Sequence, residues 1–278
     1  MTVFLFTLII FIGACFAGLL GALTGLGGGV VIIPLLSYLG IDFHYAIGTA
    51  LVAVIATSSG SAAAYVKEGV TNMRIGMFLE IATTMGAVTG AFLVASKIVP
   101  TYIVAIIFGL ILIFSAINSI RKKSEVILQK SSETAVKLKL NGSFPTPNGE
   151  IKYGVKNVAG GFSMMALAGI LSGLLGIGSG AMKVIAMDNI MHIPFKVSTT
   201  TSNFMIGVTA AAGAFIYLQK GYITPELCLP VVIGVLLGAI LGSKILLKID
   251  TAKLRTVFSV IIFIVAIDMI YKGFTGNI

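Results

Sequence analysis

Charged residues are what this sequence has least of. Asp, Glu, Lys and Arg make up 10% of its 278 residues, and 57% are hydrophobic, whereas soluble domains are about 25% charged. The deficit is spread over long apolar runs rather than confined to one core segment. The composition therefore excludes an ordinary soluble domain and predicts an integral membrane protein.

Cysteine and histidine are almost absent, with two residues of each. Cys15 and Cys228 lie in apolar runs, and His44 and His192 are far apart, so we expect neither a disulfide framework nor a metal site. The apolar segments contain no nucleophile with a base and no paired carboxylates. There is no P-loop, and no strand pattern precedes the glycine cluster at residue 25. We therefore expect no enzyme and no cofactor.

The formal net charge of +9 lies mostly in connecting segments. This distribution is typical of the cytoplasmic loops of a membrane protein. No surface with basic and aromatic residues interleaved is visible, so nucleic acid is not an expected partner. The N-terminal run lacks a basic n-region and continues past Cys15, which indicates a retained first helix rather than a signal peptide.

Apolar segments separated by Gly, Pro and charge predict an all-α, multi-spanning helical bundle in the lipid bilayer. Most are near the ~20 residues that a helix needs to cross a membrane. Two are short and directly follow a glycine cluster, so we expect broken helices there. The segments are 3–24, 28–41, 44–66, 75–96, 100–120, 157–177, 180–192, 197–218, 225–247 and 254–272.

An internal repeat divides the chain. GLLGALTGLGGG at Gly18–Gly29 matches GILSGLLGIGSG at Gly169–Gly180, and the following segments match at an offset of 152 residues. We predict a first transmembrane repeat at 1–120, a linker at 121–156 and a second repeat at 157–278. The linker is polar and contains SFPTPNG, so it is expected to be flexible.

Lys and Arg residues predict the orientation of the repeats. The linker carries eight of them against three acidic residues, which places it in the cytoplasm. An inverted repeat, with five crossings in each half, adds Lys67, Arg74, Lys196 and the basic residues of 244–255 to that side. A parallel repeat with re-entrant short segments places fewer there. The pattern favours the inverted arrangement.

The glycine clusters are candidate substrate-binding elements. Irregular backbone is tolerated within a bilayer only inside protein or along a wet cavity. Matching breaks in two inverted repeats indicate the central site of a transporter, where helix N-termini favour anions. Close helix packing alone is the alternative role, which stays open for Gly18, Gly21, Gly169 and Gly173. The candidate site residues here are Gly25, Gly27, Gly28, Gly29, Gly176, Gly178, Ser179 and Gly180.

Two ionisable residues lie in the second short segment. A lysine deep in a bilayer is expensive and is a functional candidate by default, so Lys183 is a candidate anion ligand. Alternatively, it pairs with Asp188 or reaches a headgroup. Asp188 is a candidate proton carrier, or it caps a helix or pairs with Lys196. Glu80 is expected near a membrane interface, either solvated or paired.

A run of hydroxyl residues, Ser198–Ser202, and then Asn203 open the helix after the second short segment. Part of this run is expected to cap the helix N-terminus. The rest are candidate donors to anion oxygens: Thr200, Thr201, Ser202 and Asn203, with Thr49 on the matching helix. For Thr57, Ser58 and Ser59, bonds to the preceding helix carbonyls are an equal alternative.

GLLGALTGLGGGVVIIPLL in the first half and GLLGIGSG before a Ser/Thr-rich helix in the second resemble the TauE/SafE family of sulfite exporters. The resemblance covers nearly the whole chain apart from the linker. It implies a multi-pass carrier of small sulfur-containing anions in the inner membrane of the cell, coupled to an ion gradient, with Pro34 part of the signature. The second copy departs from the pattern at Ser179 and Lys183, and has no proline that corresponds to Pro34.

Three functions remain open at this point. The first is a secondary transporter of sulfur oxyanions or organosulfonates, such as sulfite, sulfoacetate or taurine-related compounds, working by ion-coupled alternating access. The second is a passive anion channel or a carrier of another small solute. An integral membrane enzyme is the weakest. Whether the chain works alone or as a homodimer is also open.

Overall fold

The computed structural model describes residues 3–95, 127–146, 149–175 and 179–275, with scattered positions between 102 and 117. The predicted segment 100–120 therefore lies mostly outside the described residues. The helices of the first half are α1 (Val3–Thr24), α2 (Gly29–Tyr38), α3 (Phe43–Lys67) and α4 (Met73–Ala95). Those of the second half are α7 (Val158–Leu175), α8 (Gly180–Ile185), the π-helical turn η1 (Ala186–Ile190), α9 (Phe195–Gln219), α10 (Pro225–Lys248) and α11 (Thr251–Thr275).

Helix lengths and composition confirm a multi-pass membrane protein. Five helices among the described residues are long and apolar enough to cross a bilayer: α1, α3, α9, α10 and α11. Large apolar side chains such as Phe4, Met77, Phe215 and Ile264 point outward and are more than half exposed. An apolar exterior of this extent would be costly in water and is what a lipid-facing surface requires. The predicted helix boundaries agree with these elements to within about three residues.

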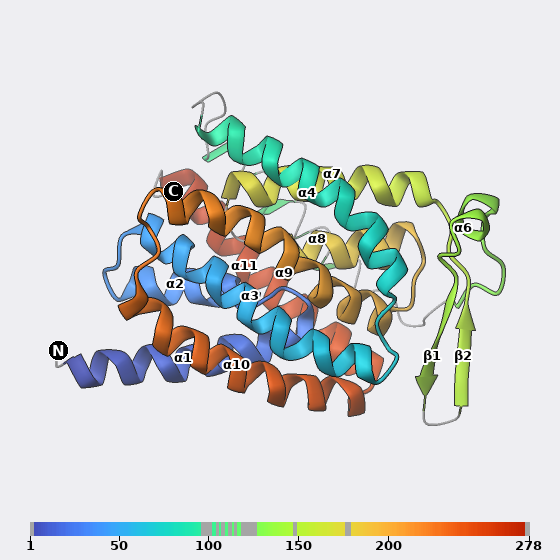
Figure 1. The fold of residues 1–278 in the computed structure, drawn as a ribbon, viewed down its shortest axis with the longest axis horizontal. Helices are drawn as coiled ribbons and strands as arrows, with labels where there is room; N and C mark the ends of the chain where they lie inside the picture. The colour runs from blue at the N-terminus through green and yellow to red at the C-terminus, as the bar shows by residue number, and fades with distance from the viewer. Residues whose placement is uncertain are drawn as a thin grey trace.

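The helices of the two halves pack in matching pairs. α1 packs along α10, α4 packs along α7, and α3 packs along α9 between them (Figure 1). Glycines bring both outer pairs close together. A Cβ on Gly238 would lie 1.9 Å from the Cys15 carbonyl oxygen, and one on Gly86 would lie 2.2 Å from that of Ala166. Gly86 and Gly238 are 152 residues apart, so the same packing device occurs in both halves.

The first helices of the two halves run in opposite directions through the bundle. α1 begins at the end of the molecule far from the β1–β2 hairpin, whereas α7 begins beside that hairpin (Figure 1). α2 and α8 are both short and each follows a glycine cluster, as predicted. With 10 residues, α2 extends about 15 Å at ~1.5 Å per residue and does not cross a ~30 Å hydrocarbon core alone.

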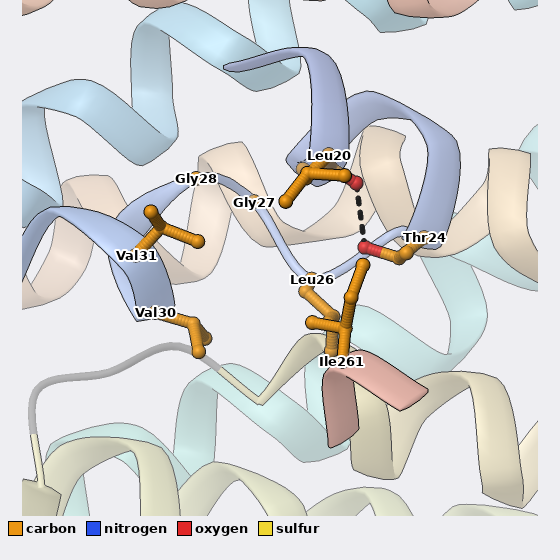
Figure 2. A pocket seen from close by; sticks show the side chains of 9 residues that line it. Leu20, Thr24, Leu26, Gly27, Gly28, Val30, Val31 and Ile261 are labelled. Atoms are coloured by element: carbon orange, nitrogen blue, oxygen red, sulfur yellow. Dashed lines mark hydrogen bonds between the residues drawn. The ribbon is translucent and has the colours of Figure 1, made fainter. Parts of the chain in front are cut away.

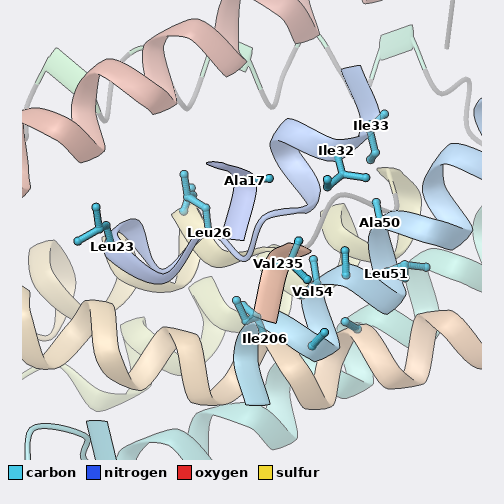
Figure 3. Packing of buried hydrophobic residues seen from close by; sticks show 14 of the residues in the cluster. Ala17, Leu23, Leu26, Ile32, Ile33, Ala50, Leu51, Val54, Ile206 and Val235 are labelled. Atoms are coloured by element: carbon cyan, nitrogen blue, oxygen red, sulfur yellow. The ribbon is translucent and has the colours of Figure 1, made fainter. Parts of the chain in front are cut away.

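The main apolar core surrounds the first glycine break. Ile32, Val54 and Ile206, from α2, α3 and α9, are buried in it, and Val235 joins them from α10 (Figure 3). Small residues fill the spaces between these side chains, among them Ala17 and Ala50. The break is thereby held among apolar side chains of both halves, away from lipid.

The expectation of a flexible linker is wrong for residues 127–156. They form α6 (Glu133–Lys137) and a hairpin of β1 (Gly142–Thr146) and β2 (Gly149–Tyr153), with Phe144 opposite Ile151. The run Pro147-Asn148-Gly149 is a turn signal in the sequence, and Gly149, which pairs with Thr146, has a φ of +115°, a conformation that favours glycine. The hairpin is anchored by Phe144 and Tyr153, which are buried against the ends of α4 and η1. The fold is therefore all-α except for this small sheet.

Asn72 fastens this hairpin to the bundle. Its Nδ2 donates to the Leu140 carbonyl oxygen at 3.1 Å and to the Tyr153 hydroxyl at 2.8 Å, while its Oδ1 accepts from the Ile75 amide at 3.1 Å. Burial raises the pKa of the Tyr153 phenol to about 12, with the Asn72 bond acting in the opposite direction. The phenol is therefore protonated at neutral pH.

Asn72→Asp should loosen the hairpin while keeping the start of α4. The carboxylate still accepts from Ile75 but no longer donates to Leu140 or Tyr153, at a cost of about 1–3 kcal/mol for buried acceptors left unpaired. We expect faster proteolysis within residues 142–153 of the detergent-purified protein. Asn141→Asp, on an exposed neighbour, is the control. Equal cleavage of both variants would show that apolar contacts alone hold the hairpin.

Candidate functional site

The first glycine break, at Gly25, contacts the start of α8 at Gly180, 155 residues later in the chain. α1 ends at Thr24, and Gly25 follows with φ +74°, a conformation that favours glycine. α8 begins at Gly180 directly against it. A Cβ on Gly180 would lie 2.2 Å from the Gly25 carbonyl oxygen and 2.7 Å from the Leu26 Cα. The contact therefore requires glycine at residue 180.

Side chains of α9, together with Tyr65 of α3, donate hydrogen bonds to backbone carbonyl oxygens at the two breaks. Ser202 Oγ donates to the Gly25 carbonyl oxygen at 2.8 Å and to that of Gly180 at 3.2 Å. Asn203 Nδ2 and the Tyr65 hydroxyl both donate to the Ala22 carbonyl oxygen, at 2.8 and 3.0 Å. Carbonyls in the last turn of a helix, such as that of Ala22 in α1, have no partner within the helix, and hydrocarbon supplies none. Two of the predicted ligand-binding residues, Ser202 and Asn203, thus use their donors on the protein's own backbone carbonyls.

Among the described residues beside the breaks, two buried polar atoms have no hydrogen-bond partner. They are Ser179 Oγ, directly before α8, and Asn203 Oδ1. Ser179 is 2% exposed and Asn203 is fully buried. A buried polar atom left unpaired costs about 1–3 kcal/mol, so such atoms in native structures need an explanation. One donor and one acceptor are thereby available to a small polar ligand.

The other predicted hydroxyl residues lie farther from this centre. Thr200 donates to the Val70 carbonyl oxygen at 3.2 Å, and Thr201 accepts from the Asn72 amide at 3.1 Å, so both hold the α3–α4 connection. Thr49 lies on α3 against α10, where its Oγ1 is 3.9 Å from Cys228 Sγ. These three are buried contacts between helices.

The predicted capping role of the hydroxyl run is wrong. α9 begins at Phe195 after Pro194, and no side chain caps it. Instead, Ser198 and Thr199 donate to carbonyl oxygens of residues 193 and 195. Thr57 and Ser59 likewise donate to the carbonyls four residues before them. Ser58 differs, because it donates across to the Asn203 carbonyl oxygen of α9 at 2.5 Å.

Of the first cluster, Gly27 and Gly28 pack close to their surroundings. A Cβ on Gly27 would lie 2.5 Å from Ile206 Cδ1, and one on Gly28 would lie 3.1 Å from the Ala17 carbonyl oxygen. Gly29 opens α2. Gly176 and Gly178 lie outside the described residues.

Lys183, one turn after Gly180, is fully buried in an ion pair. Its Nζ lies 3.0 Å from Glu80 Oε2 and donates to Thr209 Oγ1 at 2.5 Å. Thr209 donates in turn to Glu80 Oε1 at 2.5 Å. The carboxylate partner is thus Glu80 of α4, and the alternative pairing with Asp188 is wrong. Asp188 is buried in η1, 4% exposed.

Glu80 is the residue whose importance the sequence reasoning missed. α4 begins at Met73, so Glu80 is seven residues, or about 10 Å, along the helix, and it is 8% exposed. It was expected near an interface because Arg74 precedes it. Its place two turns inside an apolar segment was the available signal, since an intramembrane carboxylate is a functional candidate.

A small pocket opens beside the first glycine break (Figure 2). Leu20, Leu26 and Ile261 line it, and its one hydroxyl, that of Thr24, donates to the Leu20 carbonyl oxygen at 2.7 Å. An uncharged, apolar lining with its hydroxyl already bonded does not suit an anion. The polar centre at Ser179 and Asn203 is separate from this pocket.

Comparisons with known proteins agree on one family. The family described as "Sulfite exporter TauE/SafE" matches residues 10–269. The probable membrane transporter protein YunE of Bacillus subtilis is 28% identical over 265 residues, covering 92% of this chain and 94% of its own. A probable membrane transporter of Methanocaldococcus jannaschii, MJ0441, is 28% identical over 268 residues, covering 91% of each chain. No solved structure matches.

Proposed function

The chain belongs to the TauE/SafE family and is a multi-pass membrane transporter, and we propose that it carries small sulfur oxyanions or organosulfonates by ion-coupled alternating access. The observation that carries this proposal is the meeting of the two glycine breaks around Ser179 and Asn203. Binding sites of this kind form where discontinuous helices of two repeats face each other near mid-membrane.

The unpaired atoms fit a particular kind of anion. The Ser179 hydroxyl can donate a hydrogen bond to an anion oxygen, and Asn203 Oδ1 can accept a hydrogen bond from an O–H or N–H group of the ligand. Hydrogen sulfite and taurine each combine acidic oxygens with a donor. Lys183, three residues after Gly180, adds a positive charge on the same short helix once it is released from Glu80.

An inverted repeat accounts for the arrangement of the helices. α1 packs on α10 and α7 packs on α4, which are matching pairs if a two-fold axis relates the halves. α1 and α7 also start at opposite ends of the bundle (Figure 1). We propose that the hairpin end faces the cytoplasm, because Lys67, Arg74 and Lys156 lie at this end. The membership of the TauE/SafE family supports the inner membrane as the location.

Thermal unfolding with a panel of anions tests the function. The panel comprises sulfite, thiosulfate, sulfate, taurine, sulfoacetate, acetate and chloride at matched ionic strength. A ligand at 100 times its Kd stabilises by about 2.7 kcal/mol. We expect a sulfur oxyanion or sulfonate to raise the unfolding temperature of the wild type and of Ser163→Ala, an exposed serine on α7, but not of Ser179→Ala.

Stabilisation by a neutral solute with none by the anions would contradict the proposal. A passive channel is the second candidate, and flux into proteoliposomes separates it from a carrier. A carrier gives saturable, pH-dependent flux, whereas a channel gives flux that increases in proportion to concentration.

A further inference from the structure

We propose that Glu80 and Lys183 together bind one proton and one monovalent anion, with the proton on the Glu80 carboxylate and the anion on the Lys183 ammonium. This inference rests on the proposed function, since it names the coupling ion and the coupling residue of the same carrier. The sequence had suggested Asp188 for that role.

The geometry is a closed ring of charge-assisted hydrogen bonds. Lys183 Nζ contacts Glu80 Oε2, and Thr209 Oγ1 accepts from Lys183 while donating to Glu80 Oε1. Thr84 donates to the same Oε1 at 3.3 Å. An ammonium has three protons to donate, and the described residues supply acceptors for two of them. Both carboxylate oxygens are occupied, whereas Lys183 retains one donor for a ligand.

Charge balance explains why the proton and the anion load together. The pair is neutral as it stands, and an uncompensated buried charge would cost several kcal/mol. A proton alone would leave Lys183 unpaired, and an anion alone would lie beside the Glu80 carboxylate. When a proton forms an O–H bond on Glu80 and an anion takes its place on Lys183, the site is neutral again. One proton and one negative charge then move together.

The ion pair also joins the two halves of the molecule. Glu80 belongs to α4, whereas Lys183 and Thr209 belong to α8 and α9. Thr209 lies seven residues after Ser202, on the same face of α9 and about 10 Å along it. The pair is thereby linked through two short stretches of helix to the meeting point of the glycine breaks. Its release removes a bond that holds α4 to the helices carrying the candidate site.

Few other titratable groups lie near Glu80. α4 packs against α7 and α9, and α7 contains no titratable side chain. On α9, Lys196 donates to carbonyl oxygens of residues 247 and 249, and Tyr217 lies two turns beyond Thr209. On the second short segment, Asp188 lies five residues beyond Lys183. Arg74, at the start of α4, is exposed.

Binding of methanesulfonate between about pH 5.5 and 8.5 tests the inference, because this anion keeps a single charge over that range. We expect its affinity for the wild type to fall about tenfold per pH unit where Glu80 is deprotonated in the free protein. Glu80→Gln mimics the protonated acid, so its affinity should not change with pH. Glu226→Gln, an exposed carboxylate at the start of α10, should keep the wild-type slope.

Infrared spectra report the proton itself. Adding methanesulfonate to the wild type should produce the C=O stretch of a protonated carboxyl that is missing from Glu80→Gln. The double variant Glu80→Gln/Lys183→Met should lack it too, and this variant keeps the site neutral in case the single one does not fold. No such band in the wild type, or its loss in Asp188→Asn instead, would overturn the inference. So would a pH slope that persists in Glu80→Gln.

The two tests separate this inference from the function on which it rests. A Glu80 band that appears on acidification alone, with no binding of methanesulfonate or of any anion in the unfolding panel, would refute the anion carrier and the coupled loading together, and would leave Glu80 as a proton site only. Anion binding without the band or the slope would leave the carrier standing and refute Glu80 as its coupling residue.

Discussion

Lys183→Met should lower the free energy of unfolding by about 3–5 kcal/mol, because it leaves the Glu80 carboxylate buried without its partner. Lys183 is fully buried and the Glu80 side chain is 10% exposed, at an Nζ–Oε2 distance of 3.0 Å. Unfolding of the detergent-purified protein, followed by circular dichroism, measures the change. Buried pairs differ in this respect from surface pairs, which contribute about 0–1 kcal/mol.

The chain contains a matched control for this experiment. Lys272 and Asp268 form an ion pair at 2.9 Å on α11, with side chains 15% and 32% exposed. Because this pair is less buried than Glu80–Lys183, Lys272→Met should lower the free energy of unfolding by less than Lys183→Met does. The double variant Glu80→Gln/Lys183→Met should recover most of the loss, since no charge is then buried alone. Equal effects of Lys183→Met and Lys272→Met would mean that the Glu80–Lys183 ion pair is not formed in the folded protein.

Gly180→Ala should abolish anion stabilisation and cost about 3 kcal/mol, at the upper end of the range for overpacking. The added Cβ would lie 2.2 Å from the Gly25 carbonyl oxygen. Because backbone rather than a flexible side chain opposes it, the two breaks must move apart. Ser202 can then no longer donate to both Gly25 and Gly180, so the site loses its bridge as well as its packing.

Gly60→Ala is the control for this substitution. Its added Cβ would meet Ala239 Cβ and Leu236 Cδ2 at 3.4 Å, which is ordinary contact. An alanine within helix α3 should be neutral or add about 0.5 kcal/mol, because glycine is unfavourable inside a helix. Thermal unfolding with and without the stabilising anion compares the two variants. If Gly180→Ala retained the anion shift, the meeting of the breaks would not form part of the binding site.

The linker shows which structural features a local sequence pattern predicts and which it does not. Its polar composition suggested flexibility, but Phe144 and Tyr153 lie in two short stretches on either side of the turn signal Pro-Asn-Gly. That local signal for a hairpin was present in the sequence. What it did not contain was the surface to which the hairpin binds, because Asn72 and Met191 come from distant segments that converge only in the folded chain.

The sequence by itself determined the membrane class, the helical segments, the family resemblance and the two glycine breaks at matching positions. These follow from hydropathy, periodicity and repeated motifs, which are local or comparable along the chain. Only the tertiary structure decided which polar groups meet. Hydropathy gives a helix but not its rotation, so the pairing of Lys183 with Glu80, 103 residues away, depended on how α4, α8 and α9 pack. The same packing left Ser179 Oγ and Asn203 Oδ1 unpaired among the described residues, because the groups that meet there come from segments that converge only in the folded chain.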